Sequence, residues 1–238
     1  MTRRPVDGVV FDLDGVLVDS EIWWDEARRA WATDHGRPWT EADRRAVMGA
    51  NGREWSRTMR DRLGVDVEPA TIEAEVVERV VERYRTEGPP RIPGAAEAVA
   101  RIADVIPVAV ASSAHSDVIA AALDGLDLRD RFAVVVSSDE VERGKPAPDV
   151  YLEAARRLGI APDRLLVVED SRNGILAAKA AGMTALLVPN ATIPPAPGTS
   201  EAADITLGSI AELDPAELGL RARRPRPRRR RVPSEHAT

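Results

Sequence analysis

The sequence contains no cysteine, which excludes disulfide bonds, thiolate nucleophiles and zinc or iron–sulfur sites held by cysteine. Any metal ion must therefore be bound by oxygen ligands or by the three histidines. The chain also lacks an apolar run of about 18 residues that could span a membrane, and its start, MTRRPVDG, lacks the apolar segment of a signal peptide. We therefore expect a cytoplasmic protein with no membrane partner.

Lysine is scarce, because Lys145 and Lys179 are the two lysines among 33 basic residues. A bias in genome composition explains most of this scarcity. The presence of Lys145 in the segment VERGKPAPD still points to a role, because a compact ammonium group serves in sites where the planar guanidinium of arginine does not.

Positive charge is concentrated at the C-terminal end. Residues 221–238, RARRPRPRRRRVPSEHAT, contain eight arginines and one glutamate, so they carry +7, and the rest of the chain carries −13 of a total of −6. The acidic body argues against nucleic-acid binding by the folded part, whereas the tail alone could bind nucleic acid or polyphosphate. Because the tail is rich in charge and poor in apolar residues, we expect it to be disordered.

The hydrophobic pattern changes along the chain. A short β-branched run at 6–11 predicts a strand buried on both faces. Residues 21–86 carry apolar side chains at helical spacing, with glycine and proline stops, which predicts an inserted helical unit. From residue 95 onward, predicted helices and apolar strands alternate, as is typical of a parallel sheet covered by helices.

We therefore expect an α/β fold with a doubly wound, Rossmann-like parallel sheet and an inserted helical cap. The predicted core comprises residues 1–19 and 88–220, and the predicted cap comprises residues 20–87. All five tryptophans fall in the cap, where they either pack the helices together or, for Trp23 or Trp24, face the cleft between cap and sheet. A monomer or a weak dimer is expected.

Polar or charged side chains follow four of the predicted strands where each strand ends. In chain order they are Asp12 and Asp14, Ser112 and Ser113, Lys145, and Glu169 and Asp170. Because the carboxyl ends of parallel strands lie on one rim of the sheet, where ligands bind, we expect these side chains to form a single site.

The chemistry of this set favours phosphoryl transfer. Several carboxylates that cannot all be buried as free anions call for a hard divalent cation, and oxygen ligands suit Mg²⁺. A lysine ammonium and a serine hydroxyl beside such a cation suit the oxygens of a phosphoryl group. One carboxylate can be the nucleophile, and the second, two residues on, can protonate the leaving oxygen and later activate water.

Four segments, in order, carry a resemblance to a known family: FDLDGVLVDSE, VAVASS, RGKPAPDVYLEAARRLG and VVEDSRNGI. With them the chain resembles, over roughly residues 6–213, the haloacid dehalogenase-like (HAD) phosphohydrolases that carry a helical cap after the first strand. It looks most like the branch that contains beta-phosphoglucomutase and small sugar-phosphate phosphatases. The resemblance implies a HAD-like core and hydrolysis through an aspartyl phosphate.

The resemblance also implies a role for each residue of the rim. Asp12 would be the nucleophile and a magnesium ligand. Asp14 would be the general acid and base, with its backbone carbonyl on the metal. Ser112 would donate a hydrogen bond to the phosphoryl oxygens, and Lys145 would neutralise them.

Two further carboxylates complete the metal site that the resemblance implies. Asp170 would ligate Mg²⁺, and Glu169 would either ligate it directly or support the ligands from beside them. At the bend after the first strand, Gly15 would let the chain turn toward the cap, as expected of glycine at a tight turn.

Substrate contacts are expected from both sides of the site. Ser113 lies next to the motif serine. As a hypothesis, Asn51, Arg53 and Trp24 line the closed pocket, because two of them lie in the cap loop GANGREW and the third lies in the first cap helix. The connections near residues 16–21 and 86–94 would act as hinges for closure of the cap.

Within the family, Asp14 argues against a dehalogenase, which does not need the second acid. The absence of lysine from 15–86 argues against phosphonate cleavage through a cap Schiff base. A beta-phosphoglucomutase-like phosphosugar mutase remains the alternative, although its relatives have a histidine in the first cap helix where this chain has Trp24, and the family's basic cap-loop residue does not align clearly with Gly52 or Arg53.

We therefore predict a magnesium-dependent phosphatase that acts on a small, sugar-phosphate-like metabolite. The non-enzymatic alternative is an interaction protein that the arginine-rich tail tethers to nucleic acid or polyphosphate. The two can be told apart by deleting residues 221–238, because the phosphatase would keep its activity and the tethered protein would lose a salt-sensitive binding.

Overall fold

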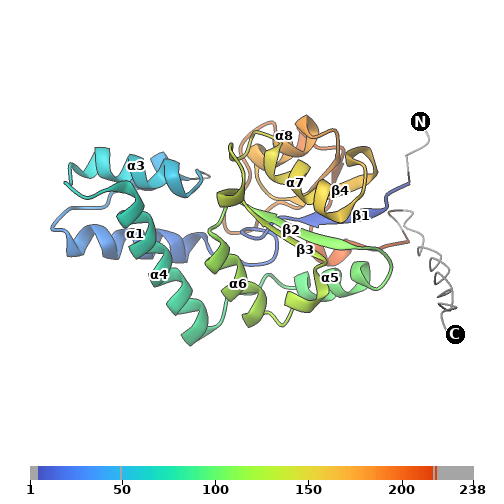
Figure 1. Ribbon diagram of the computed structural model, residues 1–238, viewed down its shortest axis with the longest axis horizontal. Coiled ribbons are helices and arrows are strands. Elements are labelled where there is room, and N and C mark those ends of the chain that lie inside the picture. Colours follow the sequence, from blue (N-terminus) through green and yellow to red (C-terminus); the bar gives the residue numbers. More distant parts are fainter. Residues whose placement is uncertain (1–4, 49, 217, 219–238) are drawn as a thin grey trace, which may run out of the picture.

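A parallel sheet of six strands forms the centre of the computed structural model, which describes residues 5–48, 50–216 and 218 (Figure 1). The strands lie in the order β3-β2-β1-β4-β5-β6, and every neighbouring pair is parallel. They are β1 (Gly8–Phe11), β2 (Val108–Ser112), β3 (Val134–Ser137), β4 (Leu165–Glu169), β5 (Thr184–Leu187) and β6 (Ile205–Thr206). The predicted doubly wound α/β fold is thus confirmed.

The central strands carry apolar side chains on both faces, and helices cover both faces of the sheet. Val9 of β1 packs in the same apolar cluster as residues of α5 and α6, whereas Val10 packs with residues of α7 and α8. The helices that follow the cap are α5 (Ala95–Ala103), α6 (Ser116–Gly125), α7 (Asp149–Leu158), α8 (Arg172–Ala180) and α9 (Thr199–Ala202). Within the described part of the chain, no helix has the length and apolar character needed to cross a membrane.

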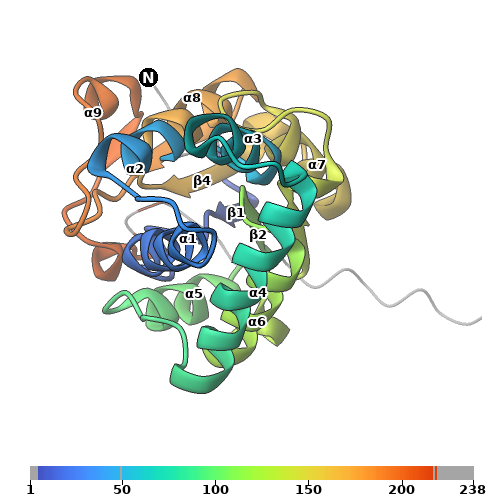
Figure 2. The ribbon, with the colours of Figure 1, turned by 90° about the vertical axis from the view of Figure 1, so that its left-hand side faces the viewer.

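Four helices between β1 and α5 stand beside the sheet, at the end toward which β1 runs (Figure 1). They are α1 (Glu21–Asp34), α2 (Glu41–Val47), α3 (Gly52–Leu63) and α4 (Pro69–Glu87). Their ends follow local sequence signals: Thr40 and Asn51 form capping boxes, Gly64 ends α3 in the left-handed conformation, and Pro69 opens α4. Seen from that end, the four helices lie in front of β1, β2 and β4 (Figure 2).

The sequence left open whether the tryptophans pack the helices together or face the cleft between cap and sheet, and the structure shows both. Trp31 is fully buried, and its Nε1 donates a hydrogen bond to Glu75 at 2.6 Å, which ties α1 to α4. Trp39 donates to Asp25 of α1 at 2.8 Å. Trp24 and Trp55, by contrast, line the cavity between the helices and the sheet.

The two connections between the helical insert and the sheet run side by side. In the segments 16–21 and 86–94, Val18 pairs in antiparallel fashion with Arg91, and the backbone N–H of Asp19 donates to the carbonyl of Pro90 at 2.8 Å. The expected arginine-rich tail, residues 221–238, lies outside the described residues.

Candidate active site

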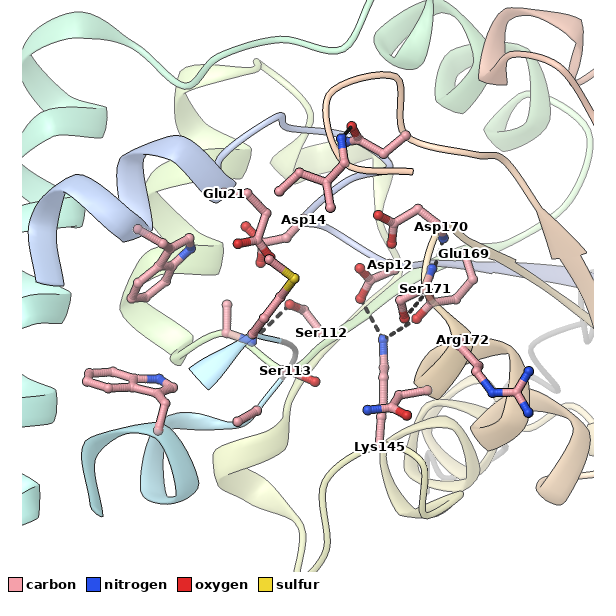
Figure 3. Close-up of a pocket in the computed structure, with 18 of the residues that line it drawn as sticks. Asp12, Asp14, Glu21, Ser112, Ser113, Lys145, Glu169, Asp170, Ser171 and Arg172 are labelled. Atoms are coloured by element: carbon pink, nitrogen blue, oxygen red, sulfur yellow. Dashed lines mark hydrogen bonds and ion pairs between the residues drawn. The ribbon is translucent and has the colours of Figure 1, made fainter. Parts of the chain in front are cut away.

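Three of the predicted site residues stand where the central strands end. Asp12 directly follows β1, Ser112 is the last residue of β2, and Glu169 is the last residue of β4. Since β1 lies between β2 and β4, these ends are neighbours. Figure 3 shows the three side chains together with Lys145 and Asp170. They line a cavity of about 340 Å³ whose wall is formed by residues of both the sheet and the cap.

Lys145 connects the two acidic strand ends. Its Nζ donates to Oδ1 of Asp12 at 2.6 Å, to Oε1 of Glu169 at 2.7 Å and to the carbonyl of Ala111 at 3.2 Å, and it lies 4.8 Å from the ring centroid of Tyr151. Burial alone would lower the pKa of Lys145, but Asp12 and Glu169 outweigh it and raise this pKa well above its ordinary value. Lys145 is therefore a fixed positive charge beside Asp12.

Both carboxylate oxygens of Glu169 have hydrogen-bond donors. Oε1 accepts from Lys145 and from the hydroxyl of Tyr151 at 2.8 Å. Oε2 accepts from the backbone N–H groups of Asp170 and Ser171 at 3.0 and 2.9 Å and from the Ser171 hydroxyl at 2.9 Å. Burial would raise the pKa of Glu169, but Lys145 and these hydrogen bonds lower it. Glu169 is thus an ionised group that orients Lys145 and the start of α8.

Asp12, Glu169 and Asp170 form an acidic cluster, because one carboxylate oxygen from each lies within 4.8 Å of the others. Gly15 lies against this cluster, because a Cβ atom at that position would be 2.0 Å from Oδ2 of Asp170. Its φ is +82°. Among the described residues, Lys145 is the one cation that forms ion pairs in this cluster, and it forms them with Asp12 and Glu169. The oxygen ligands and the excess of negative charge fit a hard divalent cation.

Two pKa values are raised by burial together with the excess of negative charge. Burial raises the pKa of Asp12 to about 7, Lys145 opposes this shift, and Glu169 and Asp14 add to it. Burial, followed by the charges of Glu169 and Asp12, raises the pKa of Asp170 well above its ordinary value. A bound cation would favour the ionised form of both groups. The cluster therefore suits a metal ion better than it suits free carboxylates.

A residue of the connection between the first strand and the cap contacts the side chain of Asp14. The hydroxyl of Ser20 donates a hydrogen bond to Oδ1 of Asp14. Burial raises the pKa of Asp14, and hydrogen bonds from Ser20 and Trp24 oppose the shift. A raised pKa suits a carboxyl group that must carry a proton before giving it to a leaving group.

Ser112 and Ser113 line the cavity. Oγ of Ser112 accepts a hydrogen bond from the backbone N–H of Ala114 at 3.0 Å, so its own proton is available for an acceptor in the cavity. Ser112 does not cap the helix that follows, because His115 is the N-cap residue of α6 and accepts from the backbone N–H of Asp117. The serine hydroxyl is therefore free of a capping role.

Of the three cap residues expected to line the pocket, Trp24 does so, whereas Asn51 and Arg53 are not among the residues at the cavity. Oδ1 of Asn51 caps α3 by accepting from the backbone N–H of Glu54 at 3.1 Å. Its Nδ2 lies only 2.6 Å from the position that a Cβ atom would take at Gly144, so this loop rests on the core next to the site lysine. Arg53 is exposed.

The cap wall of the cavity includes residues that the sequence did not identify: Glu21, Arg28, Trp55 and Glu73. Glu21 and Arg28 lie three residues before and four residues after Trp24, so they share its face of α1. The expectation that Trp24 lines the pocket could therefore have been extended to them. Tyr151 was also missed, since nothing in the pattern of α7 indicates that its hydroxyl reaches Glu169.

The parallel sheet, the inserted helices and the acidic rim define an α/β enzyme with a capped site for a cation and a phosphoryl group. The chain matches the family model of the haloacid dehalogenase-like hydrolases over residues 6–182, and it belongs to this family. The family and fold expected from the motifs are thereby confirmed.

Individual relatives extend this result beyond the family model. A phosphorylated carbohydrates phosphatase from Thermotoga maritima is 35% identical over 179 residues, which are 75% of this chain and 82% of the relative. Hexitol phosphatase B of Escherichia coli is 33% identical over 237 residues, which cover 91% of this chain and 98% of the relative. The crystal structure of CbbY from Rhodobacter sphaeroides in complex with phosphate superposes with a TM-score of 0.78 at 28% identity, covering 90% of this chain and all of that chain.

Proposed function

We propose that the protein is a magnesium-dependent phosphatase that removes phosphate from a small, sugar-phosphate-like metabolite through an aspartyl phosphate on Asp12. The ion pair between Lys145 and Asp12, beside the acidic cluster, is the observation that carries this proposal. This pair supports the proposal because a carboxylate that can act as a nucleophile, a lysine ammonium and further carboxylate oxygens lie close together at the cavity. The relatives named as phosphatases of phosphorylated carbohydrates and of hexitol phosphates support the substrate class.

In the first half of the reaction, a carboxylate oxygen of Asp12 attacks phosphorus and the bond from phosphorus to the substrate oxygen breaks. Asp14 gives its proton to that leaving oxygen. Lys145 and the hydroxyl of Ser112 stabilise the charge on the phosphoryl oxygens. Asp12, Asp170 and the backbone carbonyl of Asp14 would hold Mg²⁺, which would supply further positive charge to these oxygens.

In the second half, Asp14 takes a proton from a water molecule, and the water oxygen attacks the phosphorus of the aspartyl phosphate. The bond from phosphorus to the Asp12 oxygen breaks, so that inorganic phosphate leaves and the carboxylate is restored. The proton that Asp14 gains in this step replaces the one that it gave to the leaving oxygen.

Glu169 acts on this chemistry through its neighbours. Its oxygens already accept hydrogen bonds from Lys145, Tyr151 and Ser171, and this supports a role in positioning the lysine over a role as a direct metal ligand. Asp170, the residue that follows β4, is then the carboxylate at this strand end that would bind the metal.

A screen of phosphorylated metabolites with Mg²⁺ tests the proposal. Hydrolysis of several sugar or sugar-alcohol monophosphates with release of inorganic phosphate is the expected result. Beta-glucose 1-phosphate with a trace of its bisphosphate tests the mutase alternative, because a mutase would produce glucose 6-phosphate and a phosphatase would release phosphate. Conversion to glucose 6-phosphate faster than any release of phosphate would contradict the proposal.

A further inference from the structure

One face of α1 contributes to the wall of the cavity. Glu21, Trp24 and Arg28 follow one another at spacings of three and four residues, and all three line the cavity. Trp55 of α3 lies beside them, with its ring centroid 6.3 Å from that of Trp24. The Cζ atom of Arg28 lies 5.2 Å from the Trp24 centroid and 5.1 Å from the Trp55 centroid. The two indole rings thus hold the guanidinium group in place.

Arg28 is buried without a polar partner for part of its guanidinium group. The residue is 7% exposed, its Nε finds no hydrogen-bond acceptor, and it forms no ion pair with any of the residues that the structure describes. An unsatisfied buried donor on a charged group is costly, so proteins rarely keep one without a use. Because Arg28 lines the cavity, a ligand that enters the cavity can reach the guanidinium group.

We propose that Arg28 is a specificity-determining residue that donates hydrogen bonds to hydroxyl oxygens of a neutral, polyhydroxylated substrate chain while its phosphate lies at Asp12. This inference rests on the proposed phosphatase function. The same wall supplies the complementary groups, because Glu21 can accept hydrogen bonds from hydroxyl groups and the indole faces of Trp24 and Trp55 can cover C–H surface.

The charges of the wall favour a neutral chain over a second phosphate. Among the described cap residues that line the cavity, Arg28 is the one cation, whereas Glu21 and Glu73 are both acids. A second phosphate would bring about two negative charges toward this wall, and like charges in a partly enclosed site are costly. Monophosphates of sugars or sugar alcohols should therefore be preferred to their bisphosphates.

Kinetics with four substrates test this assignment in the full chain with Mg²⁺: sorbitol 6-phosphate, fructose 1-phosphate, fructose 1,6-bisphosphate and p-nitrophenyl phosphate. The substitution Arg28→Met keeps an unbranched apolar stem and removes the hydrogen-bond donors, and Arg28→Lys keeps the charge. Arg29→Met is the matched control, because Arg29 is exposed on the same helix and pairs with Asp25. Circular dichroism and melting temperature establish that each variant is folded.

The ratio of kcat/KM for the better sugar monophosphate to kcat/KM for p-nitrophenyl phosphate should fall about 10- to 100-fold in Arg28→Met, as expected for lost hydrogen bonds to a charged group. Arg28→Lys should lower this ratio by less, and Arg29→Met should leave it within about twofold. An unchanged ratio in the folded Arg28→Met variant would overturn the inference while leaving the phosphatase intact.

A wild-type preference for the bisphosphate that disappears in Arg28→Met would also overturn the inference, because it would make Arg28 an anchor for a second phosphate. If the wild-type protein hydrolysed neither the sugar phosphates nor p-nitrophenyl phosphate, the proposed function itself would fall and this inference with it. The aromatic substrate therefore separates the two failures.

Discussion

The ammonium group of Lys145 lies 2.6 Å from Oδ1 of Asp12. We assign nucleophilic attack to the carboxylate of this aspartate. The same ammonium lies 2.7 Å from Glu169, so one positive charge serves two buried carboxylates. In the proposed mechanism, Lys145 therefore has two roles. It favours the ionised form of Asp12, which is needed for attack, and it presents positive charge to the incoming phosphoryl group.

Replacing Lys145 with methionine should lower kcat/KM for p-nitrophenyl phosphate on the order of 100-fold, because a preorganised charge beside the phosphoryl oxygens is lost. Lys145→Arg should not restore activity, since the larger planar guanidinium does not fit the position of the compact ammonium. The second lysine offers a matched control: Lys179 lies on the surface of α8 near Asp204, and Lys179→Met should leave the kinetics unchanged. Equal losses in both lysine variants would contradict the assigned role.

Asp12→Asn should abolish turnover while leaving the melting temperature close to that of the wild type, because asparagine keeps the shape of aspartate and cannot form the acyl phosphate. Rapid quenching of the wild type with a sugar monophosphate, followed by peptide mass spectrometry, should find one phosphoryl group on the peptide that contains Asp12. Detection of no such adduct, under conditions in which turnover is measured, would refute covalent catalysis at this residue.

Asp14→Asn should lower kcat by a factor of about 100 to 10,000, the contribution usual for general acid–base catalysis. The loss should be smaller for p-nitrophenyl phosphate than for a sugar phosphate, because p-nitrophenolate leaves readily without a proton. A loss of equal size for the two leaving groups would argue that Asp14 acts in some way other than proton donation.

Removal of metal with EDTA should silence the enzyme, and Mg²⁺ should restore it and raise the melting temperature. In the metal-free protein, burial and the charges of Glu169 and Asp14 raise the pKa of Asp12 from 3.8 to about 7 against the opposing charge of Lys145. Between these values the native state binds a proton that the unfolded state releases, so the stability of the metal-free protein should increase as the pH falls through this window.

The same titration governs the effect of the metal. Protons and Mg²⁺ compete for Asp12, so a fixed Mg²⁺ concentration should raise the melting temperature more at about pH 8 than at about pH 6. Asp170→Asn should reduce this stabilisation at both pH values. Stabilisation by Mg²⁺ that was independent of pH and of Asp170 would place the ion elsewhere.

The sheet and the rim of the site were predictable from the sequence for a simple physical reason. Strands buried on both faces leave continuous apolar runs, and in a parallel sheet their ends must meet. The strand pattern alone therefore predicts that Asp12, Ser112 and Glu169 lie together. The nature of the ligands, carboxylates with one lysine and no cysteine, then limits the chemistry to a hard cation and an anionic group.

The cap wall was less predictable because it depends on how four helices pack. Asn51 and Arg53 were expected at the pocket from their positions in a loop, but Asn51 is used as a helix cap and the Arg53 side chain is exposed. Arg28 looked like one of many arginines in an arginine-rich chain. Its burial follows from the convergence of Trp24 and Trp55, which lie on different helices, and local sequence does not encode that convergence.

Gly15 allows a test of the proposed metal site in which no proposed ligand is substituted. Gly15 and Gly36 both have positive φ, at +82° and +67°, so alanine at either position should carry a backbone cost of about 1 kcal/mol. They differ in their surroundings, because a Cβ at Gly36 meets nothing within 4 Å, whereas a Cβ at Gly15 would collide with Asp170. Gly36→Ala should therefore be slightly less stable and fully active. Gly15→Ala should lose both activity and the melting-temperature increase caused by Mg²⁺, and an active, Mg²⁺-responsive Gly15→Ala would show that Asp170 is not needed where the structure places it.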